Sequence, residues 1–122
     1  ETNSSVTRRV LHRGVKFDFE ELTWTGRGGR AITRQVVRHP GAVVILPILD
    51  AAGGGGEPDL LLVRNHRPAV GRTLLELPAG TREAGEDPAV TAARELEEET
   101  GHRCAWVELL ASFYTTPGMT DE

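Results

Sequence analysis

Glu95, Glu98 and Glu99 have the residue type and the spacing of a cation site, within the segment ARELEEETG at residues 93–101. Spaced i, i+3 and i+4, they share one face of a helix, about 100° wide. Carboxylate oxygens are the ligands that Mg²⁺ prefers, usually with water and phosphate oxygens. A bound cation would also offset the mutual repulsion of the three carboxylates. We therefore predict a divalent-cation site on this helix face.

The acidic charge of the chain is concentrated around this segment. Residues 86–99 contain six acidic residues and one arginine, a net charge of −5, whereas the whole chain carries −4. This balance favours one local cation-attracting site, and it speaks against a nucleic-acid partner, which would need a basic face. A solvated acidic helix face without metal is the alternative, because charge runs on helices commonly have that role.

Residues 88–100 are predicted to form the helix that carries these glutamates. Asp87 suits the N-cap, Pro88 the first helical position, and Gly101 the left-handed residue after the last turn. Glu97 falls on the packing side, where the pattern gives it no role. The helical period predicts a core-facing apolar stripe of Ala89, Val90, Ala93 and Leu96.

Apolar segments on both sides of the helix predict β-strands. Residues 10–37 indicate a hairpin with its turn in TGRGGR, residues 25–30. HPGAVVILPIL (residues 39–49) and DLLLVRNHR (residues 59–67) are typical of two buried, neighbouring strands, joined by a flexible connection that contains Gly53–Gly56. AWVELLASFY, residues 105–114, predicts a last strand. At 122 residues, the chain fits one domain at most.

The segment from Gly80 to His102 resembles a known family signature. Gly80 is followed by five residues and Glu86, then by seven residues and RELEEETG, residues 94–101. This pattern resembles the Nudix box, G-x5-E-x7-R-E-U-x-E-E-x-G-U, where U is a bulky aliphatic residue. His102 stands in place of the last aliphatic residue.

This resemblance implies a fold and a domain arrangement. The fold would be an α/β/α sandwich around a mixed sheet. Residues 1–38 would form a β-rich region that precedes a Nudix domain at residues 39–122. We also expect the C-terminal part of the fold to be absent from these 122 residues.

The resemblance also implies the reaction and the roles of the box residues. Such enzymes hydrolyse a nucleoside diphosphate linked to another group, and they use a divalent cation. Glu95, Glu98 and Glu99 would hold Mg²⁺, or Mn²⁺ or another divalent cation, together with the backbone carbonyl of Ala79. Arg94 would brace these catalytic glutamates. Glu99 is one candidate for the general base, and a glutamate beyond residue 122 is the other.

Two flanking stretches are similar to the ADP-ribose pyrophosphatase branch of this family: VRNHRPAVGRTLLELPAG (residues 63–80) and SFYTTPGMTDE (residues 112–122). Pro117 lies fifteen residues after His102, where that branch typically has a proline. The similarity implies Mg²⁺-dependent hydrolysis of ADP-ribose to AMP and ribose 5-phosphate. The residues it implies for substrate binding are Arg64, Arg67, Glu76, Pro117, Gly118 and Glu122.

Several alternatives remain open for these assignments. The arginines among residues 64–72 are equally typical of an exposed basic edge, and Pro117 also fits ordinary loop chemistry. The substrate could be another nucleotide sugar, such as GDP-mannose, or a dinucleotide. A Nudix-like module that binds a nucleotide without hydrolysing it is a further alternative.

Partners and location follow from composition and from the resemblance. Cys104 is the single cysteine, so an intrachain disulfide is excluded. Apolar runs fall short of the roughly 20 residues that cross a bilayer, and residues 1–10 lack an apolar signal region, so we expect a cytoplasmic protein without a membrane partner. The resemblance, and the alternating strand residues of KFDFEELTW (residues 16–24), predict a homodimer formed through the N-terminal region.

Overall fold

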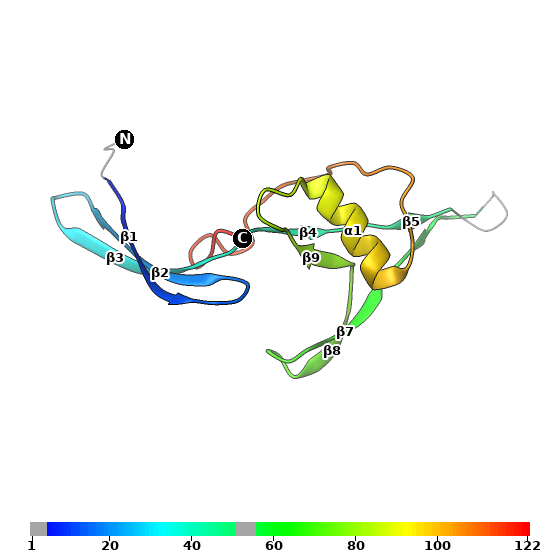
Figure 1. The fold of residues 1–122 in the computed structure, drawn as a ribbon, viewed down its shortest axis with the longest axis horizontal. Coiled ribbons are helices and arrows are strands. Elements are labelled where there is room, and N and C mark those ends of the chain that lie inside the picture. Colours follow the sequence, from blue (N-terminus) through cyan, green and yellow to red (C-terminus); the bar gives the residue numbers. More distant parts are fainter. Residues whose placement is uncertain (1–4, 51–55) are drawn as a thin grey trace. The chain divides into compact units, whose positions relative to one another are not determined.

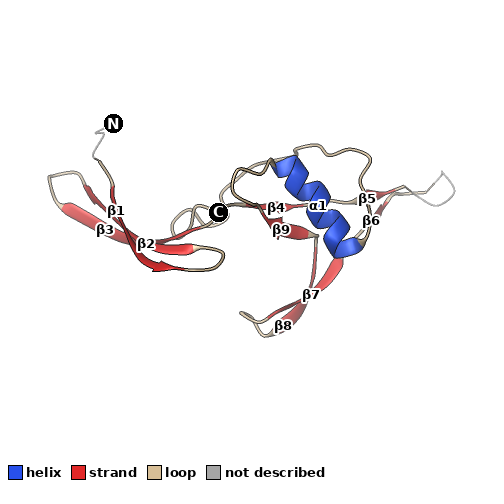
Figure 2. Ribbon diagram, in the orientation of Figure 1, coloured by secondary structure: helices blue, strands red, loops and turns tan. Residues whose placement is uncertain are grey.

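A computed structural model describes residues 5–50 and 56–122, and this part of the chain is α/β, as predicted (Figures 1 and 2). The chain divides into two compact units. One contains residues 1–41 and 111–122, and the other contains residues 42–110. The helix described here is too short to span a membrane.

The first unit is built on a three-stranded antiparallel sheet in the order β1, β2, β3. The strands are β1 (Thr7–Arg13), β2 (Asp18–Thr25) and β3 (Ala31–Arg38). The turn after β2 lies where the sequence predicted it, but the single hairpin is wrong because a second turn separates β1 from β2. There the amide of Gly14 donates to the Phe17 carbonyl (3.1 Å) and faces the Asp18 carboxylate (3.3 Å), which reverses the chain.

Residues 111–122 belong to the same unit and contact β3. The Val37 amide donates to the Met119 carbonyl over 2.8 Å, and Val37 forms a parallel bridge with Thr120. The predicted strand at residues 105–114 is wrong, because these residues form no strand. Trp106 is 71% exposed, and Phe113 and Tyr114 are also exposed. Apolar residues favour a strand, but a strand forms only where a second backbone segment pairs with it.

The second unit contains three short antiparallel strand pairs. Strand β4 (Ala42–Val44) pairs with β9 (Ala79–Thr81), β5 (Ile48–Leu49) with β6 (Asp59–Leu60), and β7 (Val63–Arg67) with β8 (Arg72–Glu76). The predicted neighbours do pair, through β5 and β6. The two long buried strands are wrong. Each segment is broken into two short strands, and the first exposes Val44 and Ile48 whereas the second exposes Leu60. The glycine connection between them lies mostly outside the described residues.

Helix α1 runs from Pro88 to Thr100, with the predicted bounds and caps. The Asp87 carboxylate accepts from the Ala89 amide over 2.8 Å. Gly101 has φ 73° and donates its amide to the Glu97 carbonyl (2.9 Å), closing the last turn.

The buried face of α1 differs from the predicted stripe. The helix packs against β4 and β9 with Thr91, Ala92 and Leu96 buried. Leu96 is confirmed, whereas Ala89 is exposed and Val90 is 58% exposed. Glu95 lies over Gly80 of β9. The buried face of α1 is therefore rotated toward the glutamates, relative to the predicted apolar stripe.

Candidate functional site

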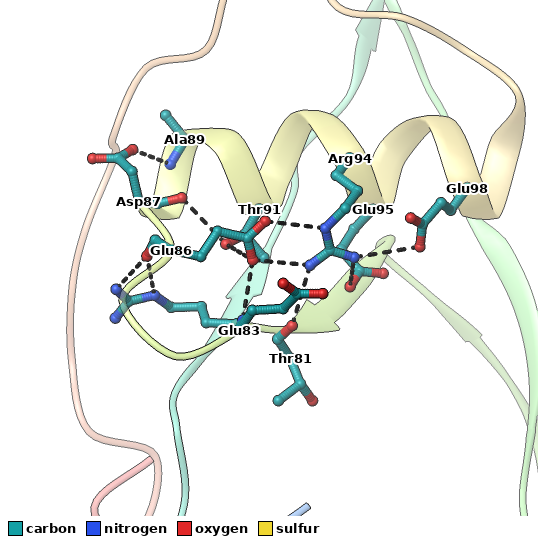
Figure 3. Close-up of polar contacts among 10 residues, drawn as sticks. Thr81, Glu83, Glu86, Asp87, Ala89, Thr91, Arg94, Glu95 and Glu98 are labelled. Atoms are coloured by element: carbon teal, nitrogen blue, oxygen red, sulfur yellow. Dashed lines mark hydrogen bonds and ion pairs between the residues drawn. The ribbon is translucent and has the colours of Figure 1, made fainter.

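Arg94, at the middle of α1, contacts three carboxylates (Figure 3). Its Nε and Nη2 donate to the two oxygens of Glu86 over 3.1 and 3.0 Å. Its Nη1 donates to Glu95 Oε1 over 2.8 Å and to Glu98 Oε2 over 3.3 Å. These partners raise the pKa of Arg94, mainly through the bonds to Glu86 and then Glu95. The structure therefore brings together Glu86, Arg94, Glu95 and Glu98, from the helix and from the loop that precedes it.

Glu86 receives further hydrogen bonds from its own loop and from the helix. The Glu83 amide donates to Oε2 over 3.1 Å, and the Thr91 hydroxyl lies 2.8 Å from the same oxygen. Arg94 chiefly, then these two donors, lower the pKa of Glu86 to about 2. Glu86 is thus held ionised and fixes the orientation of Arg94.

Thr91 and Arg82 are site residues that the sequence analysis missed. Thr91 is fully buried, and its hydroxyl reaches either Glu86 or the Asp87 carbonyl, 3.2 Å away. Arg82 donates to the backbone carbonyl of Glu86 over 2.6 and 3.2 Å. A threonine four residues after the N-cap is a signal for such a bond to the i−4 carbonyl. For Arg82 the sequence holds no comparable signal, because its partner is a backbone atom.

Gly80 in β9 makes room for Glu95. A Cβ atom built on Gly80 would overlap the Glu95 carboxyl group, so any larger residue there would displace this side chain. The Glu95 side chain is only 14% exposed. The glycine is therefore required by close packing of the strand on the helix, and not by an unusual backbone conformation.

Glu99 lies over the start of the same strand. Its Oε2 accepts from the Ala79 amide over 3.2 Å. The sequence-based interpretation assigned the Ala79 carbonyl to a metal, and the structure does bring Ala79 and Glu99 together. The role of that carbonyl stays a prediction.

Arg67 and Glu76 form a two-pronged ion pair on the β7–β8 hairpin, with N–O distances of 3.0, 3.1 and 2.7 Å. The hydrogen bonds between the two side chains lower the pKa of Glu76 and raise the pKa of Arg67. The nearby charge of Glu99 raises the pKa of Arg67 further. Arg64 and Arg67 are three positions apart in β7, so their side chains point to opposite faces of the strand. The structure thus joins Arg67 and Glu76 beside the acidic face and does not bring Arg64 to them.

The remaining predicted substrate residues, Pro117, Gly118 and Glu122, belong to the other unit. Pro117 and Gly118 lie in a turn closed by the amides of Met119 and Thr120, which both donate to the Thr116 carbonyl (2.9 and 3.0 Å). Their part in a substrate site stays a prediction.

Glu97 differs from the other three glutamates of the helix. It is exposed and pairs with Arg103 over 2.7 Å. The expectation that it faces the packing side is wrong, because the buried face is rotated away from it.

The glutamates are suitable metal ligands by type, since hard divalent cations prefer carboxylate oxygens. Among residues 5–50 and 56–122, however, no three acidic, histidine or cysteine side chains converge closely enough to hold a metal ion. Arg94 holds one oxygen each of Glu95 and Glu98, and Glu99 is turned to Ala79. Side-chain rotation of Glu98 and Glu99, which are both exposed, would be needed to gather the ligands.

A separate apolar cavity of about 510 Å³ lies in the same unit. Ala92, Leu96 and Trp106 are among its lining residues, and none of the predicted site residues lines it. The apolar cavity and the charged face of α1 are therefore different features.

The NUDIX domain profile matches residues 38–122. The chain is 46% identical to the methanol dehydrogenase activator of Bacillus methanolicus and 44% identical to the ADP-ribose pyrophosphatase of Bacillus subtilis, over 77% of this chain and 48% of each relative. It is 42% identical to the ADP-ribose pyrophosphatase of Mycobacterium tuberculosis, over 97% of this chain and 55% of that protein. The chain spans about half the length of these curated relatives.

A solved structure described as an ADP compounds hydrolase has the same fold. The TM-score is 0.76 at 22% identity, over 96% of this chain and 61% of that one. At this identity the match supports the fold alone.

Proposed function

The chain belongs to the Nudix family, with the matched domain at residues 38–122, and from this premise we propose that the protein hydrolyses the pyrophosphate bond of ADP-ribose. The products would be AMP and ribose 5-phosphate. The observation that carries the proposal is the network of Arg94 with Glu86, Glu95 and Glu98, which holds two of the predicted metal ligands on the acidic face of α1. The two relatives named ADP-ribose pyrophosphatase support the choice of substrate.

Nudix hydrolases generally use divalent cations, and we assign this role to Mg²⁺, with Mn²⁺ or another divalent cation as a substitute. Glu95, Glu98, Glu99 and the carbonyl of Ala79 would hold it. When bound, such a cation supplies charge neutralisation for the pyrophosphate oxygens and acidity for a coordinated water. The family relation and the carboxylate donors support this assignment.

Residues of the chain supply the other parts of the chemistry. Arg94 limits the repulsion among the glutamates and restricts their orientations. Arg67 presents a planar guanidinium that suits a phosphate oxygen, with Glu76 fixing its orientation. Glu99 is one candidate to accept the proton from the attacking water, since its Oε1 accepts no hydrogen bond from the described residues. Pro117, Gly118 and Glu122 would contact the ribose side of the substrate.

The assembly and setting of the protein are part of the same proposal. The protein would be a cytoplasmic homodimer formed through residues 1–38, without a nucleic-acid or membrane partner. The exposed outer strand β1 supports the dimer. All seven residues of β1 are exposed, and a sheet edge of this kind suits pairing between subunits. Size measurement by light scattering checks the dimer, and a monomeric mass would contradict it.

The test compares Glu99→Gln with Glu97→Gln, a matched change on the same helix at a residue outside the proposed site. We expect Glu99→Gln to lower kcat for ADP-ribose about 100-fold or more, because a metal ligand is lost, and Glu97→Gln to match the wild type. Rates would be measured with Mg²⁺ on ADP-ribose and on GDP-mannose.

Three results would contradict the proposal. Equal activity of the Glu99 variant and the wild type would show that the acidic face of α1 takes no part in catalysis. Faster turnover of GDP-mannose would change the substrate. Nucleotide binding without turnover in the wild type would indicate a binding module. Calorimetric titration with Mg²⁺ and Mn²⁺, with and without nucleotide, tests the metal directly.

A further inference from the structure

Arg38, at the end of β3, joins two carboxylates that lie far from it in the sequence. Its Nε donates to Glu20 Oε2 of β2 over 2.9 Å, and its Nη1 donates to Asp121 Oδ2 over 2.6 Å. The Glu20 side chain is mostly buried, so it fixes Arg38 from the side of the sheet. The remaining arm of Arg38 is thereby directed at the C-terminal segment of the same unit.

Asp121 uses both of its oxygens in this contact. While Oδ2 accepts from Arg38, Oδ1 accepts from the backbone amide of His39 over 2.8 Å. Partial burial opposes ionisation of Asp121, but the bonds from His39 and Arg38 outweigh it and lower its pKa. One aspartate therefore fastens the segment to two consecutive residues, at and just after the end of β3.

The segment held in this way is a closed loop. The Thr115 amide donates to the Glu122 carbonyl over 3.0 Å, which brings the two ends of the loop together. Pro117 and Gly118 lie between these ends, and the Met119 carbonyl accepts from the Val37 amide. A Cβ built on Gly118 meets no atom within 4 Å, so the loop surface at this residue is open.

We propose that Arg38 and Asp121 are positioning residues, which fix the loop Thr115–Glu122 against β3 and thereby set the affinity for the nucleotide-sugar substrate. This inference rests on the proposed function, in which Pro117, Gly118 and Glu122 contact the substrate. Neither Arg38 nor Asp121 needs to touch the substrate, because each acts through the loop that it holds.

The first test measures the anchoring without any substrate. Amide hydrogen exchange, resolved by NMR, would be compared for the wild type, Asp121→Ala, Arg38→Gln and the control Glu21→Gln. Glu21→Gln removes a similar ion pair with Arg9 (2.8 Å) from the same sheet, away from the loop. We expect exchange of the Val37, His39 and Thr115 amides to rise about five- to tenfold in Asp121→Ala, and the Val37 and Thr115 amides to follow in Arg38→Gln. Unchanged exchange of these amides would overturn the anchoring.

The second test separates affinity from chemistry. We expect both loop variants to raise KM for ADP-ribose about tenfold with kcat within about twofold, and the control to keep both values. The double variant should equal the single ones, since the two residues act on one contact. Faster exchange with an unchanged KM would overturn the positioning role. A wild type that hydrolyses no nucleotide sugar would refute the proposed function instead, and the exchange data would still decide the anchoring.

Discussion

Two arginines organise the two units of this molecule, and they differ in how far along the chain they reach. Arg94 binds Glu86, Glu95 and Glu98, all within eight positions of it. Arg38 binds Glu20 and Asp121, which are 18 and 83 positions away. The exposed fractions of the two side chains are similar, 29% and 24%. Sequence separation, and not burial, is therefore what distinguishes the two networks.

The difference shows which contacts a motif can encode. Helix period and one short loop bring the partners of Arg94 together wherever the motif folds. The partners of Arg38 meet only after β2, β3 and the C-terminal segment have assembled. We expect the Arg94 network to act on the chemical step and the Arg38 network to act on substrate affinity.

Arg94→Ala should have the largest effect. It removes the counter-charge of three carboxylates, so we expect kcat/KM for ADP-ribose to fall about 100-fold and the melting temperature to drop. Steady-state kinetics with Mg²⁺ and thermal melting provide the measurement. Unlike the Arg38 variant, this one should lower kcat.

Arg103→Ala is the matched control for that change. Arg103 also pairs with a helix glutamate, Glu97, but its side chain is largely exposed. Exposed pairs contribute little, so both kcat and stability should stay close to the wild type. A loss as large as that of Arg94→Ala would show that any ion pair on α1 is sufficient to explain the effect.

Gly80→Ala should reduce activity about tenfold, by displacing a ligand instead of removing one. The added Cβ would overlap the Glu95 carboxyl group, and the side chain would have to leave its place beside Arg94. Activity would be assayed together with Mg²⁺ affinity. Wild-type kinetics in a correctly folded variant would show that the position of Glu95 over β9 is unimportant.

Acid should weaken the fold through Glu86. Its pKa is lowered from 4.5 to about 2, so its ionised form stabilises the folded state above pH 4.5 and this contribution is lost as the pH falls toward 2. Melting temperatures of the metal-free protein, measured between pH 6 and pH 2 in steps of about one pH unit, would show the loss. Glu86→Gln should be less stable at neutral pH and should lose less on acidification. An equal acid dependence in the two proteins would argue against this role for Glu86.

Among the changes to residues of the candidate site, Thr91→Val should have the smallest effect. The change keeps the shape of a fully buried side chain but removes the hydroxyl that donates to Glu86, so we expect a loss of about 1 kcal/mol in the free energy of unfolding. Urea denaturation provides the measurement. Thr91→Ser, which keeps the hydroxyl, should retain the low pKa of Glu86, and a raised pKa in that variant would contradict the assignment.

The sequence predicted the helix better than the strands. Asp87, Pro88 and Gly101 act within one turn of the helix ends, so the bounds of α1 could be read directly. Residues 39–49 form two short strands, β4 and β5, in place of one long strand, and the apolar residues 105–114 form no strand. Strand length depends on pairing with another segment, and apolar composition alone does not reveal that partner.

The candidate site divides along the same line. The spacing of Glu95, Glu98 and Glu99 predicted their shared face. The box pattern indicated that Arg94 braces all three, and the structure shows this contact for Glu95 and Glu98, whereas Glu99 accepts from the Ala79 amide. The sequence did not reveal that Gly80 accommodates Glu95, that Thr91 supports Glu86, or that the buried face of α1 is rotated toward the glutamates. Each of these depends on how α1 lies on β9.

The amino-acid sequence by itself determined the family, through the spacing of the box residues. It also determined the helix, its caps and the contacts of Arg94 with Glu95 and Glu98, because backbone hydrogen bonding and the 3.6-residue period fix contacts over one or two turns. Only the tertiary structure decided which side of α1 is buried, which strands pair, and that Asp121 meets Arg38. Those contacts require distant segments to be brought together against the loss of chain entropy, and their outcome depends on all the segments at once.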